Sequence, residues 1–432
     1  MKSFIGMSKL IFLCSIFFCA CNQPQFMFDK SSLNRIVTQY VQNNSHPFIT
    51  MRIENGKGIP IYNYTSINQT FLPNHIIDEN SLMRIWSMSK IVTISLFMDL
   101  VEDNIVHLDE PVTKYIPEFS NLYFATDSKG VALTLTDSMK NVCPYELRQN
   151  KTKMMIRHLI NHEAGFFYAT TQNKCINSAV AKANLPKAEN SNDLINRIAK
   201  LPLIQEPGDS HFYGTNTTIL GLVAERATGT SLNKLVSNRM TEMIGISGLK
   251  YNLESNESLL PRFSGKNDTL RFAEDGDFDI FGPDFPSNKA DNKIFLGGEG
   301  MIATANGYCD FLRMLMNKGK LNDRRFLNQE TIEEITSPHT QLENKWGYNG
   351  YNLWVTSDTL KILGIGDSGL WQGGGYEGTE FWIDSKRGFV GVKMSQLHPI
   401  PKSGHEFYNE FRGEVYRQIF AYENKYGRKV HF

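Results

Sequence analysis

One apolar stretch constrains what this chain can fold into more than any other. Between Ser87 and Val101, apolar residues occupy most positions and cover nearly the whole circumference of a helix. A surface helix carries its apolar residues on one face only, so this pattern predicts a central helix with little surface in water. We expect this helix to begin at Ser87 and the rest of the chain to be organised around it.

The start of this stretch carries a serine and a lysine three residues apart, Ser87 and Lys90. Residues at this spacing lie on one helical face. Burial lowers the pKa of a lysine because it disfavours the charged form, and the neutral amine can then take the serine proton. The helix N-terminus adds a backbone N–H that can face a developing oxyanion. The pair therefore predicts nucleophilic catalysis by Ser87 with Lys90 as its proton partner.

Two other interpretations of this pair stay open. Ser-x-x-Lys occurs by chance in many proteins, with the serine capping a helix and the lysine on the surface. Here apolar residues flank Lys90 and the next charged residue is Asp99, which argues against a surface position. Ser89 is a rival nucleophile, but it is adjacent to Lys90 and points to a different face of the helix.

The N-terminal segment has the features of an export signal. Residues 1–20 combine two lysines with an apolar run that is too short to span a bilayer comfortably. The ending around Cys21 resembles a bacterial lipoprotein box, which makes Cys21 the lipidated first residue; an ordinary cleaved signal peptide is the alternative. We expect an exported protein of the bacterial cell envelope, in the periplasm or at the outer membrane. Residues 21–29 would form a tether, and the membrane would be reached only through this lipid anchor.

Charge and cysteine usage argue against two classes of function. The formal net charge is zero and no basic stripe is present, so we expect no nucleic-acid partner. Cys143, Cys175 and Cys309 form no CxxC pair and lie beside no spaced histidines, so we expect no metal site. No organic cofactor is implied. Cys143 and Cys175 could pair in an oxidising compartment, and the oligomeric state stays open.

The remaining pattern predicts an α+β fold. Residues 48–54 and 59–64 flank Asn-Gly-Lys-Gly and predict a hairpin, and residues 380–383 and 389–394 predict a second one. The simplest fold joins both hairpins in one antiparallel sheet flanked by helices, beside a mostly helical second region. We place the α/β part at about 30–110 and 296–432 and the helical part at about 111–295. Helices are expected at 156–161, 191–201, 217–228, 232–243, 307–317 and 330–336.

Several segments resemble one family. In order, they match the serine β-lactamase and penicillin-binding-protein superfamily, and within it the class C β-lactamase-like branch with family VIII carboxylesterases and D-Ala carboxypeptidase relatives. Their order and spacing make the resemblance specific. The matching segments are 87–90, 100–119, 156–165, 206–213, 220–229, 297–304 and 373–384.

The resemblance implies roles for particular residues. Ser87 resembles the acylated nucleophile, Lys90 its proton partner, and Tyr213 the tyrosine of the family's second motif, whose phenol passes protons between serine and leaving group. The alignment makes the N–H of Gly375 the second oxyanion donor beside that of Ser87. Gly374 is part of the same glycine run, which lets the strand approach the substrate closely.

The chain departs from the family pattern at two places. The asparagine of the second motif is displaced by one position, to Asn216. The third motif has Gln372 or Trp371, depending on the alignment, where the family has a cation. A cation there would meet a substrate carboxylate, so its absence favours neutral esters or amides over β-lactams and peptides.

We therefore expect a serine hydrolase whose partner is a small-molecule ester, amide or peptide. D,D-peptidase, D-aminopeptidase or β-lactamase activity is the alternative within enzymes, and a non-catalytic protein of the same fold that binds a cell-wall fragment is the alternative outside them. His162 and Glu163 resemble part of a zinc motif, but no second histidine follows at helical spacing, so we expect them to be structural.

Overall fold

The computed structural model describes residues 25–432 except 135–139, 169–172, 279, 282–284 and 341. The predicted signal and Cys21 lie outside the described residues. Within the described ranges, every helix is too short or too polar to span a bilayer.

One antiparallel sheet of eight strands organises the molecule, in the order β12-β13-β14-β15-β16-β17-β1-β2. Both predicted hairpins are present, and antiparallel pairing of β17 with β1 joins them, with Thr50 opposite Met394. The two ends of the chain therefore build one sheet, as predicted. Its strands are β1 (Phe48–Asn55), β2 (Pro60–Ile67), β12 (Glu343–Asn344), β13 (Gly347–Asn349), β14 (Trp354–Thr356), β15 (Trp371–Gly375), β16 (Thr379–Asp384) and β17 (Phe389–Met394).

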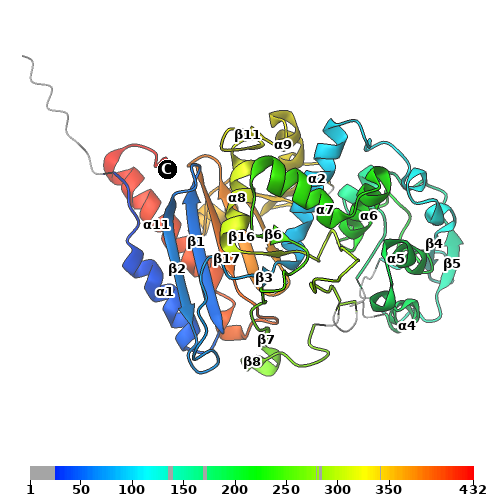
Figure 1. The fold of residues 1–432 in the computed structure, drawn as a ribbon, viewed down its shortest axis with the longest axis horizontal. Helices are drawn as coiled ribbons and strands as arrows, with labels where there is room; N and C mark the ends of the chain where they lie inside the picture. Colours follow the sequence, from blue (N-terminus) through cyan, green and yellow to red (C-terminus); the bar gives the residue numbers. More distant parts are fainter. Residues whose placement is uncertain (1–24, 135–139, 169–172, 279, 282–284, 341) are drawn as a thin grey trace, which may run out of the picture.

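Helices cover both faces of this sheet (Figure 1). On one face α1 (Lys30–Gln42) packs against α11 (Phe407–Tyr426), and their apolar residues join Trp382 and Phe389 in one core. On the other face α8 (Ala305–Met316) crosses β17 and β1, and α2 (Ser89–Glu102) lies beyond it in a second, larger core. Nearly every residue of α2 is buried, which confirms the predicted central helix.

The middle of the chain forms a region with more helix than strand, on the right in Figure 1. A disulfide between Cys143 and Cys175 lies there and ties the segment before β5 to the start of α4; Cys309 is free and buried. The helices are α3 (Ile156–Ile160), α4 (Lys174–Ala183), α5 (Ser191–Ile198), α6 (Asn216–Thr228) and α7 (Leu232–Val236), and the strands are β4 (Tyr123–Thr126) and β5 (Glu146–Gln149).

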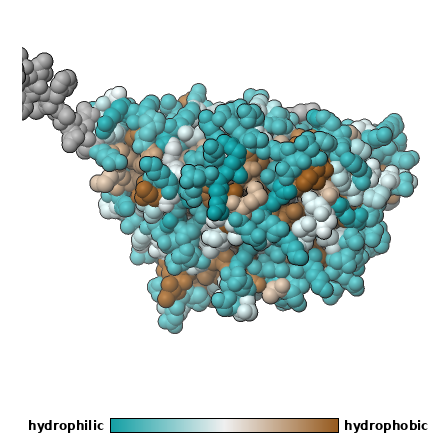
Figure 2. All heavy atoms as spheres, turned by 45° about the horizontal axis from the view of Figure 1, so that its top comes forward, coloured by the Kyte–Doolittle hydropathy of each residue, from teal (hydrophilic) through white to brown (hydrophobic). Residues whose placement is uncertain are grey.

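Short elements complete the fold. Three two-residue strands, β3 (Met83–Arg84), β9 (Ile302–Ala303) and β6 (Leu249–Lys250), form a small sheet directly before α2. Figure 2 shows polar residues over most of the visible face, with apolar residues only in small separate patches. The remaining elements are β7 (Phe263–Ser264), β8 (Arg271–Phe272), β10 (Lys320–Leu321), β11 (Arg324–Arg325), α9 (Gln329–Thr336) and α10 (Thr359–Ile362).

Three predicted helix boundaries are wrong, and the first is that of the helix expected over 191–201, which ends at Ile198. The α-helix begins at Ser89, because the chain first makes a 3-10 turn over Trp86–Met88 that contains Ser87. The helix expected over 232–243 ends at Val236 and continues as a π-helical turn over Ser237–Glu242. A wider turn rotates the following side chains, so apolar spacing alone did not locate this change.

Candidate active site

The 3-10 turn before α2 presents Ser87 at the surface of an otherwise buried segment. The strand before it is fixed by Gln396, whose side-chain amide bonds both the N–H and the C=O of Arg84, at 3.0 Å each. Trp86 has a φ of 44°, a left-handed conformation that is costly for a residue with a large side chain. Ser87 is half-buried, whereas its neighbours Trp86 and Met88 are buried. The turn therefore directs one hydroxyl outward from the core.

The three residues predicted to carry the chemistry meet at this hydroxyl. Lys90 Nζ donates to Ser87 Oγ at 3.3 Å, and the Tyr213 hydroxyl donates to the same oxygen at 2.8 Å. Lys90 Nζ also lies 5.0 Å from the centre of the Tyr213 ring. Tyr213 lies three residues before α6 and is 44% exposed, so it forms the open side of the group. The structure thus brings Ser87, Lys90 and Tyr213 together.

The expectation of an uncharged lysine is wrong. Lys90 is fully buried, and burial alone lowers its pKa, but the Glu299 carboxylate 3.1 Å away and Tyr213 raise the pKa above its ordinary value. Lys90 Nζ also donates to the carbonyl oxygen of Gly298 at 2.9 Å. A buried cation needs such a partner, and the carboxylate provides it. Lys90 is therefore an ammonium ion at neutral pH.

Tyr168 and Glu299 are site residues that sequence reasoning missed. The Tyr168 hydroxyl accepts from Lys90 Nζ at 2.7 Å and donates to Glu299 Oε1 at 2.6 Å. Burial, followed by the Glu299 charge, raises the pKa of Tyr168 well above its ordinary value, so this phenol keeps its proton. Thr218 donates to the other oxygen of Glu299. Glu299 lies in one of the segments that carried the family resemblance, whereas Tyr168 lies in none.

His162 supports the Tyr213 ring. The two rings are stacked with centroids 5.1 Å apart and planes 6° apart. The N–H of Gly214 donates to His162 Nδ1 at 3.3 Å, and His162 Nε2 lies 3.2 Å from Thr217 Oγ1. Burial, followed by the charge of Lys90, holds the pKa of His162 well below its ordinary value, so the ring is neutral. These contacts give His162 a structural part in the site.

Ser89 does not lie at the site. Its side chain is fully buried, and its hydroxyl accepts from the N–H of Met301 at 3.1 Å. This bond ties the start of α2 to the segment after Glu299. The rival serine is thereby held inside the protein, away from any substrate.

Gly375, the predicted second oxyanion donor, lies against the turn that carries Ser87. A Cβ atom on Gly375 would lie 2.3 Å from the carbonyl oxygen of Ile85, so only glycine lets β15 come this close to the nucleophile turn. Strand β14 pairs with β15 only at Trp371 and Gln372. Over the described residues, the edge formed by residues 373–375 therefore faces no strand on that side, so any backbone group that points there has no strand partner. Gly374 is exposed there.

The side chains proposed around the third motif point to opposite faces of the sheet. Gln372 Oε1 accepts from Arg412 Nη1 on α11 at 2.6 Å, on the face away from α2. Trp371, the adjacent residue, packs against the core around α2 and α8. Successive strand residues alternate between faces, so Gln372 cannot take the place of the family's cation beside Ser87. Of the two, only Trp371 is on the side of the site.

Asn216 is placed where it cannot meet a substrate. Its side chain is fully buried, and its amide group lies 3.4 Å from His162 Nδ1 and 3.4 Å from the carbonyl oxygen of Phe166. Because the asparagine of the second motif is displaced by one position, it becomes the first residue of α6, and its amide is buried at the start of that helix. The expectation that Asn216 binds substrate would need a rearrangement of these contacts.

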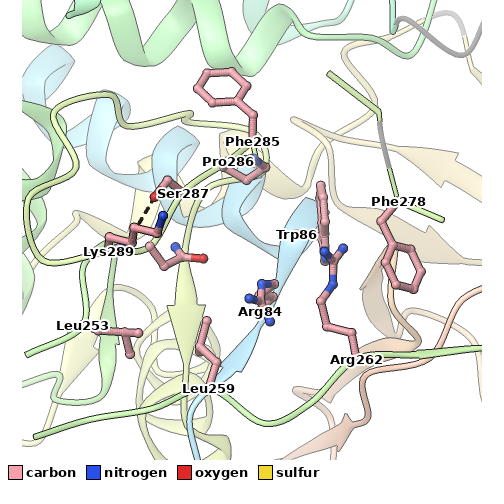
Figure 3. Close-up of a pocket in the computed structure, with 11 residues that line it drawn as sticks. Arg84, Trp86, Leu253, Leu259, Arg262, Phe278, Phe285, Pro286, Ser287 and Lys289 are labelled. Atoms are coloured by element: carbon pink, nitrogen blue, oxygen red, sulfur yellow. Dashed lines mark hydrogen bonds between the residues drawn. The ribbon is translucent and has the colours of Figure 1, made fainter. Parts of the chain in front are cut away.

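A cavity of about 140 Å³ lies beside the nucleophile turn (Figure 3). Figure 3 shows Arg262 alongside Trp86, with Phe278 on the other side of the guanidinium. Arg262 Cζ is 4.0 Å from the centre of the Phe278 ring and 5.7 Å from that of Trp86. The other lining residues are Arg84, Leu253, Leu259, Phe285, Pro286, Ser287, Asn288 and Lys289. In the described part of the chain, no group of three His, Cys, Asp or Glu side chains is arranged to hold a metal ion.

Comparison with known proteins gives these observations a family context. Residues 72–410 match the Beta-lactamase family. The chain is 27% identical over 267 residues to the ML-236A carboxylate methylbutanoyltransferase of Penicillium citrinum, a match that spans 61% of this chain but only 58% of that protein. It is 24% identical over 400 residues to the lovastatin esterase of Penicillium rubens, covering 84% of this chain and 93% of that one.

Solved structures show the same fold. EstCE1, a hydrolase with promiscuous acyltransferase activity, superposes with a TM-score of 0.72 at 18% identity, covering 89% of this chain and 98% of that one. Unliganded simvastatin synthase from Aspergillus terreus, as its selenomethionyl derivative, gives a TM-score of 0.70 at 20% identity, with 90% and 98% covered. The predicted α+β class and the superfamily resemblance are confirmed. The chain belongs to the Beta-lactamase family, and it is an enzyme of the serine hydrolase type.

Proposed function

We propose that this protein cleaves carboxylic esters through an acyl-enzyme on Ser87. The observation that carries this proposal is the convergence of Lys90 Nζ and the Tyr213 hydroxyl on Ser87 Oγ, at 3.3 and 2.8 Å. A serine hydroxyl is a weak nucleophile until a neighbouring base takes its proton. In this site two proton-carrying groups lie within reach of the one hydroxyl that faces outward.

Tyr213 is the residue that moves the proton in this proposal. Glu299 keeps Lys90 charged, so the amine is not free to accept a proton. Tyr213 reacts as the phenolate: its own proton goes to water at the exposed side of the ring, and the phenolate beside the Lys90 ammonium then takes the proton of Ser87 as Oγ attacks the carbonyl carbon. The N–H groups of Ser87 and Gly375 hold the oxyanion. When the intermediate collapses, the Tyr213 phenol gives its proton to the departing alcohol oxygen and the acyl group stays on Ser87.

The second half of the reaction repeats these steps with a new nucleophile. Water donates its proton to Tyr213 and attacks the acyl carbonyl, and Ser87 Oγ leaves with a proton returned by Tyr213. An alcohol in place of water would give acyl transfer instead of hydrolysis. The names of the relatives, a methylbutanoyltransferase and an esterase, support both outcomes, and we retain transfer to an alcohol as the second candidate function.

Esters are favoured over β-lactams and peptides because the strand beside the serine has no cation. Residues 371–375 read Trp-Gln-Gly-Gly-Gly, and Gln372 is bonded to Arg412 on the far face of the sheet. A penicillin or a peptide C-terminus presents a carboxylate, which needs a cationic partner when water is excluded. Peptidase or β-lactamase activity is thus the less favoured alternative. Binding without turnover is the other alternative, and the test below separates them.

The test uses purified protein that lacks residues 1–24. We expect hydrolysis of p-nitrophenyl butyrate without turnover of nitrocefin, and labelling by a fluorophosphonate probe that Ser87→Ala abolishes and Ser89→Ala retains. Labelling that survives in Ser87→Ala would overturn the nucleophile. Nitrocefin turnover faster than ester turnover would overturn the substrate class. Addition of a short alcohol, with mass spectrometry of the ester product, measures the share of acyl transfer.

We also retain as a proposal that the chain is exported and lipid-anchored in the bacterial cell envelope. The Cys143–Cys175 disulfide supports an oxidising compartment. Expressed in bacteria at full length, the protein should fractionate with membranes and carry lipid at Cys21. Cys21→Ala should release it, and recovery of the unaltered chain in the soluble cytoplasm would contradict the proposal.

A further inference from the structure

A buried carboxylate lies two residues after the proposed oxyanion donor Gly375. Glu377 is in the turn between β15 and β16, and its side chain is fully buried. Its Oε1 accepts from Trp86 Nε1 at 2.8 Å and from Arg262 Nε at 2.7 Å. The turn itself is fixed, because the N–H of Leu397 donates to the carbonyl oxygen of Glu377 at 2.9 Å. A charge is costly to bury, so this placement calls for an explanation.

Trp86 is the partner that connects Glu377 to the chemistry. Its left-handed φ of 44° is held in place by its bond to Glu377 and by the rings around it, with Tyr376 at 5.4 Å. The peptide group between Trp86 and Ser87 is planar, so the backbone angles of Trp86 decide where the Ser87 N–H points. A tilt of this peptide would turn the first oxyanion donor away from the substrate.

Arg262 holds the Glu377 carboxylate in place. Its Nη2 approaches Glu377 Oε1 to 2.5 Å, and its guanidinium lies between the rings of Phe278 and Trp86 (Figure 3). These two aromatic neighbours, with ring centres 4.0 and 5.7 Å from Arg262 Cζ, limit how far the guanidinium can move. Glu377 thus has two donors of fixed position, one from the nucleophile turn and one from the loop that lines the cavity.

We propose that Glu377 is a positioning residue that assembles the oxyanion hole. One carboxylate ties the turn that carries the Ser87 N–H, through Trp86, to the turn that follows the Gly375 N–H. The two donors come from segments 288 positions apart in the sequence, and a hole that binds an oxyanion needs both at a fixed separation. The inference rests on the proposed function, since it assumes acyl transfer at Ser87.

The experiment compares Glu377→Gln and Trp86→Phe with a matched control, Glu380→Gln. Glu380 lies on the same hairpin and pairs with Lys393 on the face away from the site. Active sites are titrated from the p-nitrophenol burst, and acylation and deacylation rates are expressed per titrated site. We expect both rates to fall at least tenfold in each test variant, with KM within about threefold of the wild type, because both steps pass through an oxyanion.

The double variant and the folding state separate positioning from stability. If the two residues act through their shared bond, the double variant is no slower than the slower single variant. A purely structural role would lower the melting temperature and the titrated fraction but leave the rate per site unchanged. Rates per site within twofold of wild type, or losses that multiply in the double variant, would overturn the inference.

The milder variant keeps the test decisive if Glu377→Gln does not fold. Trp86→Phe removes the N–H that reaches Glu377 together with part of the indole, and it leaves a smaller aromatic ring in place; its rate per site then decides alone. Failure of the proposed function would look different. The wild type itself would then show no burst and no labelling at Ser87.

Discussion

Two buried charge clusters lie on opposite sides of the sheet, and only one of them is arranged for chemistry. On the α11 side, Arg387 donates to Asp367, Asp384 and Glu423 at 2.9–3.3 Å, and its side chain is 4% exposed. On the α2 side, Lys90 is paired with Glu299, and the two side chains are 0% and 1% exposed. Both clusters bury a cation with its counter-charge. They differ in whether the cation also donates a hydrogen bond to a group that could react with a substrate.

The donors of Arg387 are used to join structural elements. Asp384 ends β16 and Glu423 belongs to α11, so the guanidinium fastens the C-terminal helix to the sheet. Lys90 has a hydrogen bond to Ser87 Oγ in addition to those that satisfy its charge, and Tyr213 beside it is partly exposed. A buried ion pair is therefore a candidate catalytic group when its cation also donates to a potential nucleophile and when a neighbouring side chain is exposed where a substrate could bind.

The largest expected effect is a difference in activity between variants of Lys90 and Lys393, which are both buried beside a glutamate. Lys90→Met should lower kcat/KM for p-nitrophenyl butyrate by about 10⁴-fold, because the cation that supports proton transfer at Ser87 is lost. Lys393→Met is the matched control, since Lys393 is 2% exposed and lies 3.2 Å from Glu380. The control should lose stability and keep its rate per folded molecule. Equal kinetic losses in both variants would contradict the assignment.

Arg387→Met should give the opposite result. It leaves Asp367, Asp384 and Glu423 buried without their shared cation, so the free energy of unfolding should fall by about 3–5 kcal/mol. Urea unfolding measures this loss, and active-site titration measures the rate per folded molecule, which should stay at the wild-type value. A slower rate per titrated site would show that the α11 side of the sheet also affects the chemistry.

The comparison also shows which parts of the site the sequence could predict. Ser87 and Lys90 are local in sequence, and the second motif marked Tyr213, so all three were predicted. The charge of Lys90 was not, because Glu299 is 209 positions away and only the tertiary fold brings it to 3.1 Å. Tyr168 stands in a stretch without helical or strand periodicity, so it gave no signal. Site residues that act through long-range contacts are the ones that a sequence pattern misses.

The fold was predicted where the periodicity of apolar residues was analysed, and elements were missed where it was not. The two hairpins and the buried helix α2 followed from alternation and from continuous apolar spacing. Helix α11 was not predicted, although Phe407, Phe411, Val415 and Ile419 recur every four residues and are buried. The 3-10 turn at Ser87 could not be predicted, because its left-handed Trp86 is bonded to Glu377, which in turn is bonded to Arg262, and both lie far along the chain.

A smaller effect is expected from removing one phenol in each cluster. Tyr168→Phe deletes the hydroxyl between Lys90 and Glu299, and kcat should fall about tenfold, because the direct contact between the charges remains. Tyr416→Phe deletes a hydroxyl that donates to Asp384 at 3.0 Å in the other cluster. It should cost about 1 kcal/mol of stability and leave kcat unchanged. Similar kinetics in the two variants would remove Tyr168 from the site.

The smallest effect concerns how the stability contributed by Lys90 depends on pH. Burial is the largest single influence and lowers the pKa of Lys90, but Glu299 and Tyr213 together raise it above the ordinary value of 10.5. A raised pKa adds stability that is complete below pH 10.5 and is lost as pH rises through the folded value, with a slope of at most about 1.4 kcal/mol per pH unit for one proton. Urea unfolding of the wild type and of Lys90→Met should therefore differ by a constant amount between pH 7 and 9 and converge only at higher pH. Convergence that begins below pH 9 would instead indicate a lysine that loses its proton near neutrality, and Lys90 itself would then become the base.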